Sequence, residues 1–170
     1  MSLSSELYAL TSDRLQDVYF RAGHASFDEK TGQGIYDNEV TIDQGTSHLR
    51  ATHATTTMDK QHRLTRAAAF GSPLKQAHFW TQTALDKPYL HGYADTIYYH
   101  PVIHQLELIG HARITQGENT LTAPNIRYDT QAERLITTIQ NNEGTVIRIN
   151  PKQHPEKNTW VSQTNFLQHT

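Results

Sequence analysis

Residues 38–51, Asn-Glu-Val-Thr-Ile-Asp-Gln-Gly-Thr-Ser-His-Leu-Arg-Ala, return 72 positions later as residues 110–123, Gly-His-Ala-Arg-Ile-Thr-Gln-Gly-Glu-Asn-Thr-Leu-Thr-Ala. The two copies align without a gap and are identical at Ile42/Ile114, Gln44/Gln116, Gly45/Gly117, Leu49/Leu121 and Ala51/Ala123. The same offset pairs Ala22 with Ala94, Phe27 with Tyr99 and Gln33 with Gln105. A unit that recurs at a fixed period usually buries its apolar face against its neighbour, so the sequence predicts a stacked tandem repeat.

Each copy has the pattern of two strands joined by a turn. In the first copy, Val40 and Ile42 alternate with polar residues, residues 44–47 supply turn chemistry, and Leu49 and Ala51 alternate again. In the second copy, a glycine interrupts a run of apolar residues of one parity: Leu106, Leu108, Gly110, Ala112 and Ile114. A glycine inside a strand predicts a bulge or a close approach of another backbone.

Further alternating runs cover residues 125–128, 134–139 and 145–149. Residues 64–67 are also predicted to form a strand, although the alanines that follow Arg66 suit a helical turn as well. The ungapped offset aligns residues 63–70 with residues 135–142. Short strands separated by Gly, Asn and Asp, without a helical period between them, predict an all-β sandwich, roll or barrel.

Composition limits both the size of the fold and its partners. A chain of 170 residues suits a single domain, and a hydrophobic content of 36% is modest for a dense core, which suggests a thin or open interior. The net charge of -2 does not indicate a basic surface, so nucleic acid and anionic membranes are not favoured as partners. The chain has no cysteine and therefore no disulfide framework, and no apolar run approaches the roughly 18 to 20 residues of a membrane span.

The two ends differ in composition from the centre. The start lacks the basic and apolar regions of a signal peptide, so we expect a mature form with an added initiator, its targeting segment already removed. Residues 150–158 are polar and rich in proline, lysine and asparagine, and they predict a tail or linker. The predicted division is 1–7 as an N-terminal edge, 8–149 as the domain and 150–170 as the tail, where Trp160, Phe166 and Leu167 are possible docking points.

Four motifs in order carry a resemblance to a known family. They are Tyr8-Ala9-Leu10-Thr11-Ser12-Asp13, the paired Gln-Gly turns, Gly71-Ser72-Pro73 with Ala77-His78-Phe79-Trp80, and Lys87-Pro88 leading to Gly92-Tyr93-Ala94-Asp95 and Tyr99. Over about residues 8–149 the chain resembles the OstA-like β-jellyroll family of periplasmic lipopolysaccharide-transport proteins. Two departures are Asn38-Glu39-Val40, where the family usually has Gly-Asn-Val, and a longer segment from Asp13 to Phe27.

The resemblance implies a V-shaped, open-ended antiparallel jellyroll that acts without enzymatic activity or a cofactor. Its interior would accept the acyl chains of lipid A, and its ends would pair with further copies of itself, with an LptC-like inner-membrane subunit and with an LptD-like outer-membrane subunit. The strands around residues 7–10 and 145–149 are expected at opposite ends. The lipid-binding residues predicted for the groove are Tyr8, Leu10, Phe27, Ile42, Phe79, Tyr99, Leu108 and Ile114, and ordinary core packing is the alternative for each of them.

Other functions have weaker support in the residues. The chain contains no Gly-x-Ser-x-Gly elbow, no cysteine nucleophile and no nucleotide-binding loop. Asp28-Glu29 lies in a polar turn and suits a solvated charge cluster better than a glycosidase pair. The histidines at 100, 104 and 111 are candidate metal ligands, yet their spacing gives no common face on a strand, and exposed histidines on a polar face are the favoured explanation.

Two alternatives remain open beside the lipid carrier. Trp80 next to Phe79 suits the stacking platform of a carbohydrate-binding module, although the aromatic residues are expected at inward-facing parities. An LptC-like sister subunit that lacks its membrane anchor has the same predicted roll.

Overall fold

The computed structural model describes Asp13, residues 15–138 and residues 142–151, and it contains twelve strands in one antiparallel sheet. The predictions for Tyr8, Leu10, the strand around residues 7–10 and the docking points of the tail lie outside these residues. The strands are β1 (Val18–Arg21), β2 (His24–Asp28), β3 (Gln33–Gln44), β4 (Ser47–Met58), β5 (Leu64–Phe70), β6 (Ala77–Thr81), β7 (Leu90–Ala94), β8 (Thr96–His100), β9 (Gln105–Gln116), β10 (Asn119–Asp129), β11 (Arg134–Thr138) and β12 (Val146–Arg148). A 3₁₀ turn, η1 (Pro101–Ile103), joins β8 to β9.

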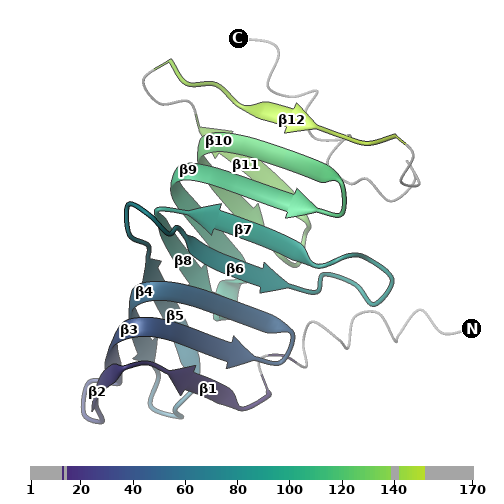
Figure 1. Ribbon diagram of the computed structural model, residues 1–170. Coiled ribbons are helices and arrows are strands. Elements are labelled where there is room, and N and C mark those ends of the chain that lie inside the picture. The colour runs from purple at the N-terminus through teal and green to yellow at the C-terminus, as the bar shows by residue number, and fades with distance from the viewer. Residues whose placement is uncertain (1–12, 14, 139–141, 152–170) are drawn as a thin grey trace, which may run out of the picture.

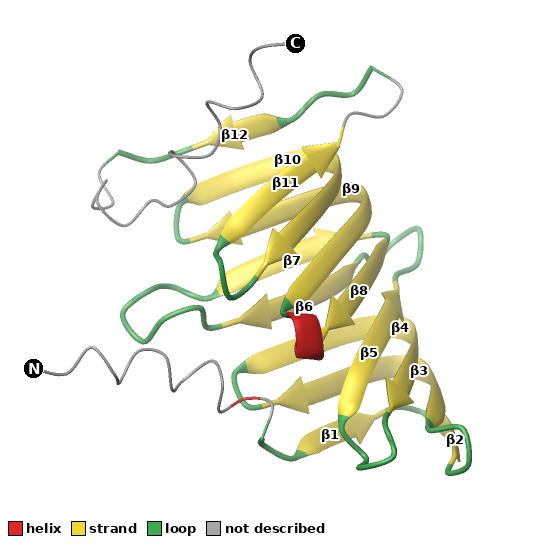
Figure 2. Cartoon of the chain, turned by 180° about the vertical axis from the view of Figure 1, so that it is seen from behind, coloured by secondary structure: helices red, strands yellow, loops and turns green. Residues whose placement is uncertain are grey.

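The sheet folds into two layers because four long strands pass through both of them (Figure 1). Strand β4, for example, pairs with β6 at residues 48–50 and with β5 at residues 53–58. The same division in β3, β9 and β10 gives one layer in the order β1-β3-β4-β6-β7-β9-β10-β12 and another in the order β2-β3-β4-β5-β8-β9-β10-β11. Seen from behind, β5, β8 and β11 lie in front of the other layer (Figure 2).

The long strands bend at bulges, as the glycine at position 110 predicts. Gly110 and His111 have positive φ values of 81° and 47°, and the pairing of β9 with β10 shifts at this point. In the first copy, Asn38 and Glu39 occupy the equivalent positions with φ values of 65° and 56°, and the pairing of β3 with β4 shifts there. The two bulges therefore place the bend from one layer into the other at the same position in each repeat.

The tandem repeat is larger than one strand-turn-strand unit. Strands β1 to β6 form one copy and β7 to β12 the other, because each strand of the first six has a counterpart with the same neighbours in the second six. The turn glycines Gly45 and Gly117 have nearly equal φ values of 57° and 59°. Both lie in the left-handed region that favours glycine.

The ungapped alignment of residues 63–70 with residues 135–142 is wrong. His53 pairs with Phe70, whereas its counterpart Asn125 pairs with Thr138, so the offset falls from 72 to 68 after the second long strand. The reason is a longer connection in the first repeat, which includes a bulge: Thr57 pairs with Arg66, whereas its counterpart Asp129 pairs with Arg134. The predicted strand at residues 64–67 itself is confirmed, since β5 runs from Leu64 to Phe70.

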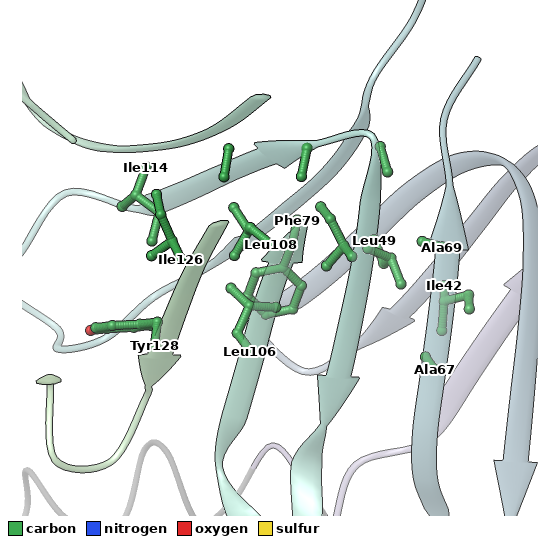
Figure 3. Close-up of a cluster of buried hydrophobic side chains, with 14 of the residues drawn as sticks. Ile42, Leu49, Ala67, Ala69, Phe79, Leu106, Leu108, Ile114, Ile126 and Tyr128 are labelled. Carbon is green, nitrogen blue, oxygen red and sulfur yellow. The ribbon is translucent and has the colours of Figure 1, made fainter. Parts of the chain in front are cut away.

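The hydrophobic core lies between the two layers and runs through both repeats (Figure 3). Side chains from β3, β4, β6 and β9 meet there, and Leu49, Phe79, Leu108 and Ile114 are all at most 3% exposed. Among the described residues there is no helix long and apolar enough to cross a membrane.

Asp13 links the N-terminal motif to the first Gln-Gly turn. Its side chain is buried and accepts a 2.6 Å hydrogen bond from the Thr46 hydroxyl, in the turn between β3 and β4. A β-carbon on Gly45 would overlap the Asp13 carboxylate. This contact holds Asp13 against the first Gln-Gly turn.

Candidate functional site

The interior between the layers contains five of the eight residues predicted to bind lipid. Ile42 (β3), Phe79 (β6), Leu108 and Ile114 (both β9) belong to the buried cluster, and Tyr99 (β8) packs against it with part of its surface exposed. The rings of Phe79 and Tyr99 lie 5.0 Å apart and are tilted by 40°. The sequence therefore identified residues that share one apolar interior, and their contact with lipid stays a prediction.

Phe27 is not packed in this interior cluster, and its contact with lipid stays a prediction. The side chain is 41% exposed, and every residue of β2 is exposed. Its repeat counterpart, Tyr99, is covered because β8 pairs with β5 of the first repeat on one side and with β9 on the other. In the described part of the chain, strand β2 pairs with β3 alone. The repeat predicted the equivalence correctly but could not predict the missing neighbour.

Several interior residues were not among the predicted site residues, although they follow the same alternation. The phenol of Tyr128 is one of them, and burial raises its pKa above the ordinary value of 10.0. The large buried side chains that share the interior with the predicted residues are Val40, Leu49, Leu90, Ile97, Leu106, Leu121, Ile126 and Tyr128. The parity of Leu49, Leu106 and Leu121 in the sequence was the signal that could have placed them.

The free space in this part of the interior is small. A cavity of about 10 Å³ lies among Ile42, Leu49, Phe79 and Tyr99, with Leu64, Ala67, Gln44, Ser47 and His48 around it. That volume is close to the room that one water molecule needs. An acyl chain can enter here only if the layers separate or side chains change rotamer.

Within the described residues, the strands at both ends of the roll have one unpaired edge (Figure 1). At one end the described partner of β1 and β2 is β3, and at the other the described partner of β11 and β12 is β10. Large apolar side chains are exposed at these ends: Tyr19 and Phe27 at the first, and Ile136, Val146 and Ile147 at the second. Unpaired strands with exposed apolar residues are suited to pairing with another chain.

The centre of the molecule shows how such ends fit together. Strand β6 pairs with β7, and β5 pairs with β8, so the second half of the first repeat joins the first half of the second. The counterparts of β5 and β6 are β11 and β12, and the counterparts of β8 and β7 are β2 and β1. The internal junction therefore pairs four strands whose repeat equivalents form the two free ends.

The outer face of the layer with β4, β6, β7 and β9 carries a stack of rings, which corrects the expectation that the aromatic residues face inward. Trp80 and Tyr93 alternate with the buried Phe79 and Gly92 and lie half-exposed on this face. Each is in contact with the ring of His78, at centroid distances of 4.6 Å and 4.2 Å. The inward parity is right for Phe79, Tyr99 and Tyr128 and wrong for Trp80 and Tyr93.

His78 is the central ring of this stack. Its Nε2 lies 3.0 Å from Nδ1 of His91, a distance at which one neutral ring donates a hydrogen bond to the other. Burial, followed by the charges of His91, Arg50 and Arg113, lowers the pKa of His78 from 6.5 to about 4. The ring is therefore neutral at pH 7.

The remaining candidate residues have ordinary structural roles. His100 ends β8, His104 follows η1 with a φ of 56°, and His111 lies in the bulge with Nδ1 2.7 Å from Asp95 Oδ2. The described part of the chain holds no group of three or more side chains able to bind a metal ion. Asp28 accepts hydrogen bonds from the backbone N–H groups of Lys30 and Thr31, at 2.8 Å and 3.2 Å, and so stabilises its own turn.

Comparison with known proteins identifies relatives of this roll. Residues 19–134 match the family model for the LptA/(LptD N-terminal domain) LPS transport protein. The lipopolysaccharide export system protein LptH of Pseudomonas aeruginosa is 32% identical over 130 residues, which cover 76% of this chain and 73% of LptH.

A solved structure has the same architecture. It is the crystal structure of LptH, described as the LptA-homologous periplasmic component of the lipopolysaccharide transport device from Pseudomonas aeruginosa. The match has a TM-score of 0.75 and 27% identity, and covers 82% of this chain and 99% of LptH. The predicted all-β jellyroll is thereby confirmed, and the chain belongs to the LptA/LptD N-terminal domain family of lipopolysaccharide-transport proteins.

Proposed function

We propose that this chain is a non-enzymatic periplasmic carrier of lipopolysaccharide, which holds the acyl chains of lipid A between the two layers of the roll. The observation that supports this function best is the apolar interior, which runs through both repeats and reaches strands with free edges at both ends. Its relatives are named as lipopolysaccharide export and transport proteins.

Apolar burial alone supplies enough free energy for this task. A saturated chain of about a dozen carbons gains on the order of 10 kcal/mol on leaving water, at roughly 0.8 kcal/mol per methylene. Part of this gain is needed to open the layers, since the interior cavity measures only about 10 Å³. Net transport in one direction then depends on energy supplied by another component.

Co-migration on a native sizing column tests the carrier function. Delipidated protein is mixed with purified lipopolysaccharide, and free polysaccharide without lipid A is the competitor. The proposal predicts saturable binding that the polysaccharide does not displace. Absence of binding, or displacement by the polysaccharide alone, would contradict the acyl-chain site and would favour the carbohydrate-binding alternative.

The second part of the proposal is that copies of the roll join end to end with the geometry of the internal junction. Strand β12 of one copy would pair with β1 of the next, as β6 pairs with β7, and β11 would pair with β2, as β5 pairs with β8. Ile147 would then face Phe20, and Leu135 would face Phe27 in the way that Ala67 faces Tyr99. Burial of the exposed apolar residues at both ends would favour this association.

The same ends would serve an LptC-like inner-membrane subunit and an LptD-like outer-membrane subunit, each through a strand added to a free edge. Because pairing of one end with the other is heterologous, it extends into a filament until such a partner covers the last edge.

Disulfide trapping tests the register, and the absence of cysteine gives a clean background. His78 faces Tyr93 in the internal junction, and the equivalent pair across two copies is Val146 with Arg21. A mixture of Val146→Cys protein and Arg21→Cys protein should therefore form a disulfide-linked heterodimer.

Tyr19→Cys is the matched control, because Tyr19 lies on the same face of β1 but two residues out of register. A shift of two residues places the Cα atoms at roughly 8 Å, beyond the reach of a disulfide. Equal trapping at positions 19 and 21, or none at position 21, would contradict the proposed register.

A further inference from the structure

The outer face of the layer with β4, β6, β7 and β9 contains a second candidate site, separate from the interior. Strand pairing arranges its side chains in two rows that cross the strands. One row consists of His48, Trp80, His91 and Thr115, and the other of Arg50, His78, Tyr93 and Arg113. Both rows bridge the junction between the two repeats.

The rings in these rows are packed face to face. His48 and Trp80 lie 4.8 Å apart with an interplanar angle of 21°, and Tyr93 lies nearly parallel to His78 at 7°. The guanidinium of Arg50 lies 5.0 Å from the Trp80 centroid, and that of Arg113 lies 4.5 Å from the Tyr93 centroid. Since neighbouring rings and guanidinium groups cover the ring faces, the stack offers few free faces for a sugar to stack on.

What the site offers instead is positive charge. Arg21 and Arg63 are paired with Asp43 and Asp59, whereas neither Arg50 nor Arg113 has an ion-pair partner within the described residues. Cation–π contacts hold these two guanidinium groups in place but do not neutralise them. Their Cα atoms are three strand spacings apart, or roughly 14 Å.

A pocket of about 600 Å³ lies against the Arg50 row. Arg50, His78 and Tyr93 line one part, and Lys75 and Gln76, from the loop before β6, line another. Glu39 also lines the pocket, and its carboxylate is 2.9 Å from Lys75 Nζ. One cation of the pocket is thus paired and Arg50 is not, so the lining carries a net positive charge that suits an anion.

The second repeat provides an internal control. A pocket of about 550 Å³ occupies the equivalent place there, against Ala112, Thr122 and Ala123, with Glu143 and Gly144 on the loop side. Thr122 stands at the position of Arg50, and Glu143 at that of Lys75. Val146 and Arg148 replace His78 and Trp80. The second pocket has a cation of its own, Arg113, at the position of Thr41, but it lacks the pair formed by Arg50 and Lys75 and the ring of His78. The same backbone frame is therefore built without that set of side chains, so the fold does not require them.

We propose that the pocket beside Arg50 binds the phosphate-bearing saccharide part of the carried glycolipid, with Arg50 and Lys75 as the groups that contact phosphate. The choice of this ligand rests on the proposed carrier function. Guanidinium groups bind phosphate through two parallel hydrogen bonds, and the hydroxyl and amide groups of Tyr93 and Gln76 suit a saccharide. Arg113, at the far end of the same row, is placed to meet a second anionic group.

His78 lines the pocket, so an anion bound there would act on its charge. The two arginines contribute to its low pKa, and a bound phosphate would offset their charge. Binding should therefore raise the pKa of His78, which a histidine in a purely structural stack would not show.

Calorimetric titration with fully deacylated lipopolysaccharide tests the proposal, because this phosphorylated oligosaccharide has no acyl chain for the interior. The wild-type protein should bind it, and Arg50→Thr, the residue of the second repeat, should weaken binding by roughly tenfold or more. The matched control is Arg66→Thr, since Arg66 also lies over an exposed ring, 4.8 Å from Tyr98, on the outside of the other layer. This control should bind within about twofold of the wild type.

Four outcomes would overturn the proposal. The first three are no binding to the wild-type protein, equal weakening by the two substitutions, and full binding of the same oligosaccharide after its phosphates are removed. Displacement of the oligosaccharide by inorganic phosphate at an equal concentration would also overturn it, by showing an anion site without selectivity for saccharide. Because the probe lacks acyl chains, each of these results leaves the test of the interior site unaffected.

Discussion

The junction between β6 and β7 and the outer edges of β1 and β12 are built from equivalent strands, which pair with each other at the junction and have no partner at the outer edges among the residues that the structure describes. Tyr99 and Phe27 illustrate the difference. They are equivalent residues on β8 and β2, yet Tyr99 packs on Phe79 while Phe27 is exposed. Burial in this fold therefore depends less on the strand's own sequence than on whether a neighbouring repeat completes the sheet.

The largest expected effect comes from placing the same charge at equivalent positions of the two junctions. Phe79 is 1% exposed, so Phe79→Arg leaves an unpaired charge in the core and should destabilise the fold by on the order of 4 kcal/mol. Ile147, its counterpart at the free edge, is 36% exposed, so Ile147→Arg should leave the melting temperature of the monomer nearly unchanged and abolish end-to-end association. Thermal unfolding and sedimentation velocity measure the two effects.

A folded Phe79→Arg protein that still binds lipopolysaccharide would move the acyl-chain site away from Phe79. An Ile147→Arg protein that associates as the wild type does would show that β12 is not part of the interface.

The two bulges allow an exchange between the repeats. In the first bulge Gly23 faces Asn38, and in the second bulge Asp95 faces Gly110. Each facing pair contains one glycine, but the glycine of one repeat stands where the other repeat has a side chain. A β-carbon on Gly110 would overlap the Asp95 carboxylate, and one on Gly23 would lie 2.7 Å from the Asn38 β-carbon. We predict that Gly110→Asn costs about 2 kcal/mol and that adding Asp95→Gly recovers more than half of this loss.

Urea unfolding of the two single variants and the double variant measures this coupling. Additive losses, with no recovery in the double variant, would show that the two glycines serve separate needs of the backbone.

The smallest effects are those of pH on two histidines in different environments. A hydrogen bond that His111 donates to the Asp95 carboxylate raises the pKa of His111 above 6.5, whereas burial lowers the pKa of His78 to about 4. The Asp95 contact should therefore stabilise the fold below pH 6.5 and be lost as pH rises through the folded pKa of His111. Burial of neutral His78 instead makes the fold less stable as pH falls from 6.5 toward 4, because the unfolded state binds a proton at a higher pH than the folded state does.

Titration of the histidine ring protons by NMR checks both directions. Asp95→Asn should lower the pKa of His111 and leave that of His78 unchanged. A His78 ring that titrates near 6.5 in the free protein would contradict the packed stack on the outer face.

The sequence predicted those features that depend on local pattern. The repeat and its parity identified β3, β4, β9 and β10, and the glycine at position 110 identified a bulge. Other features depend on contacts that a single sequence does not display. The change of offset in β11 follows from a shorter connection, and the exposure of Phe27 follows from a missing neighbour.

The outward direction of Trp80 and Tyr93 was missed for a related reason. Alternation separates two faces of a strand, but the two aromatic pairs Phe79-Trp80 and Tyr98-Tyr99 place a large ring on each face. Only the paired strands show that Phe79 and Tyr99 face the interior, while Trp80 and Tyr98 contact arginines on the outside.

Photo-crosslinking at positions 98 and 99 tests the carrier account most directly. A benzophenone side chain at either position replaces a tyrosine on the same strand, but Tyr99 packs on Phe79 in the interior and Tyr98 contacts Arg66 outside. The account predicts that lipopolysaccharide crosslinks at position 99 and not at position 98. Crosslinking at position 98 alone, or equally at both positions, would contradict an acyl-chain site between the layers.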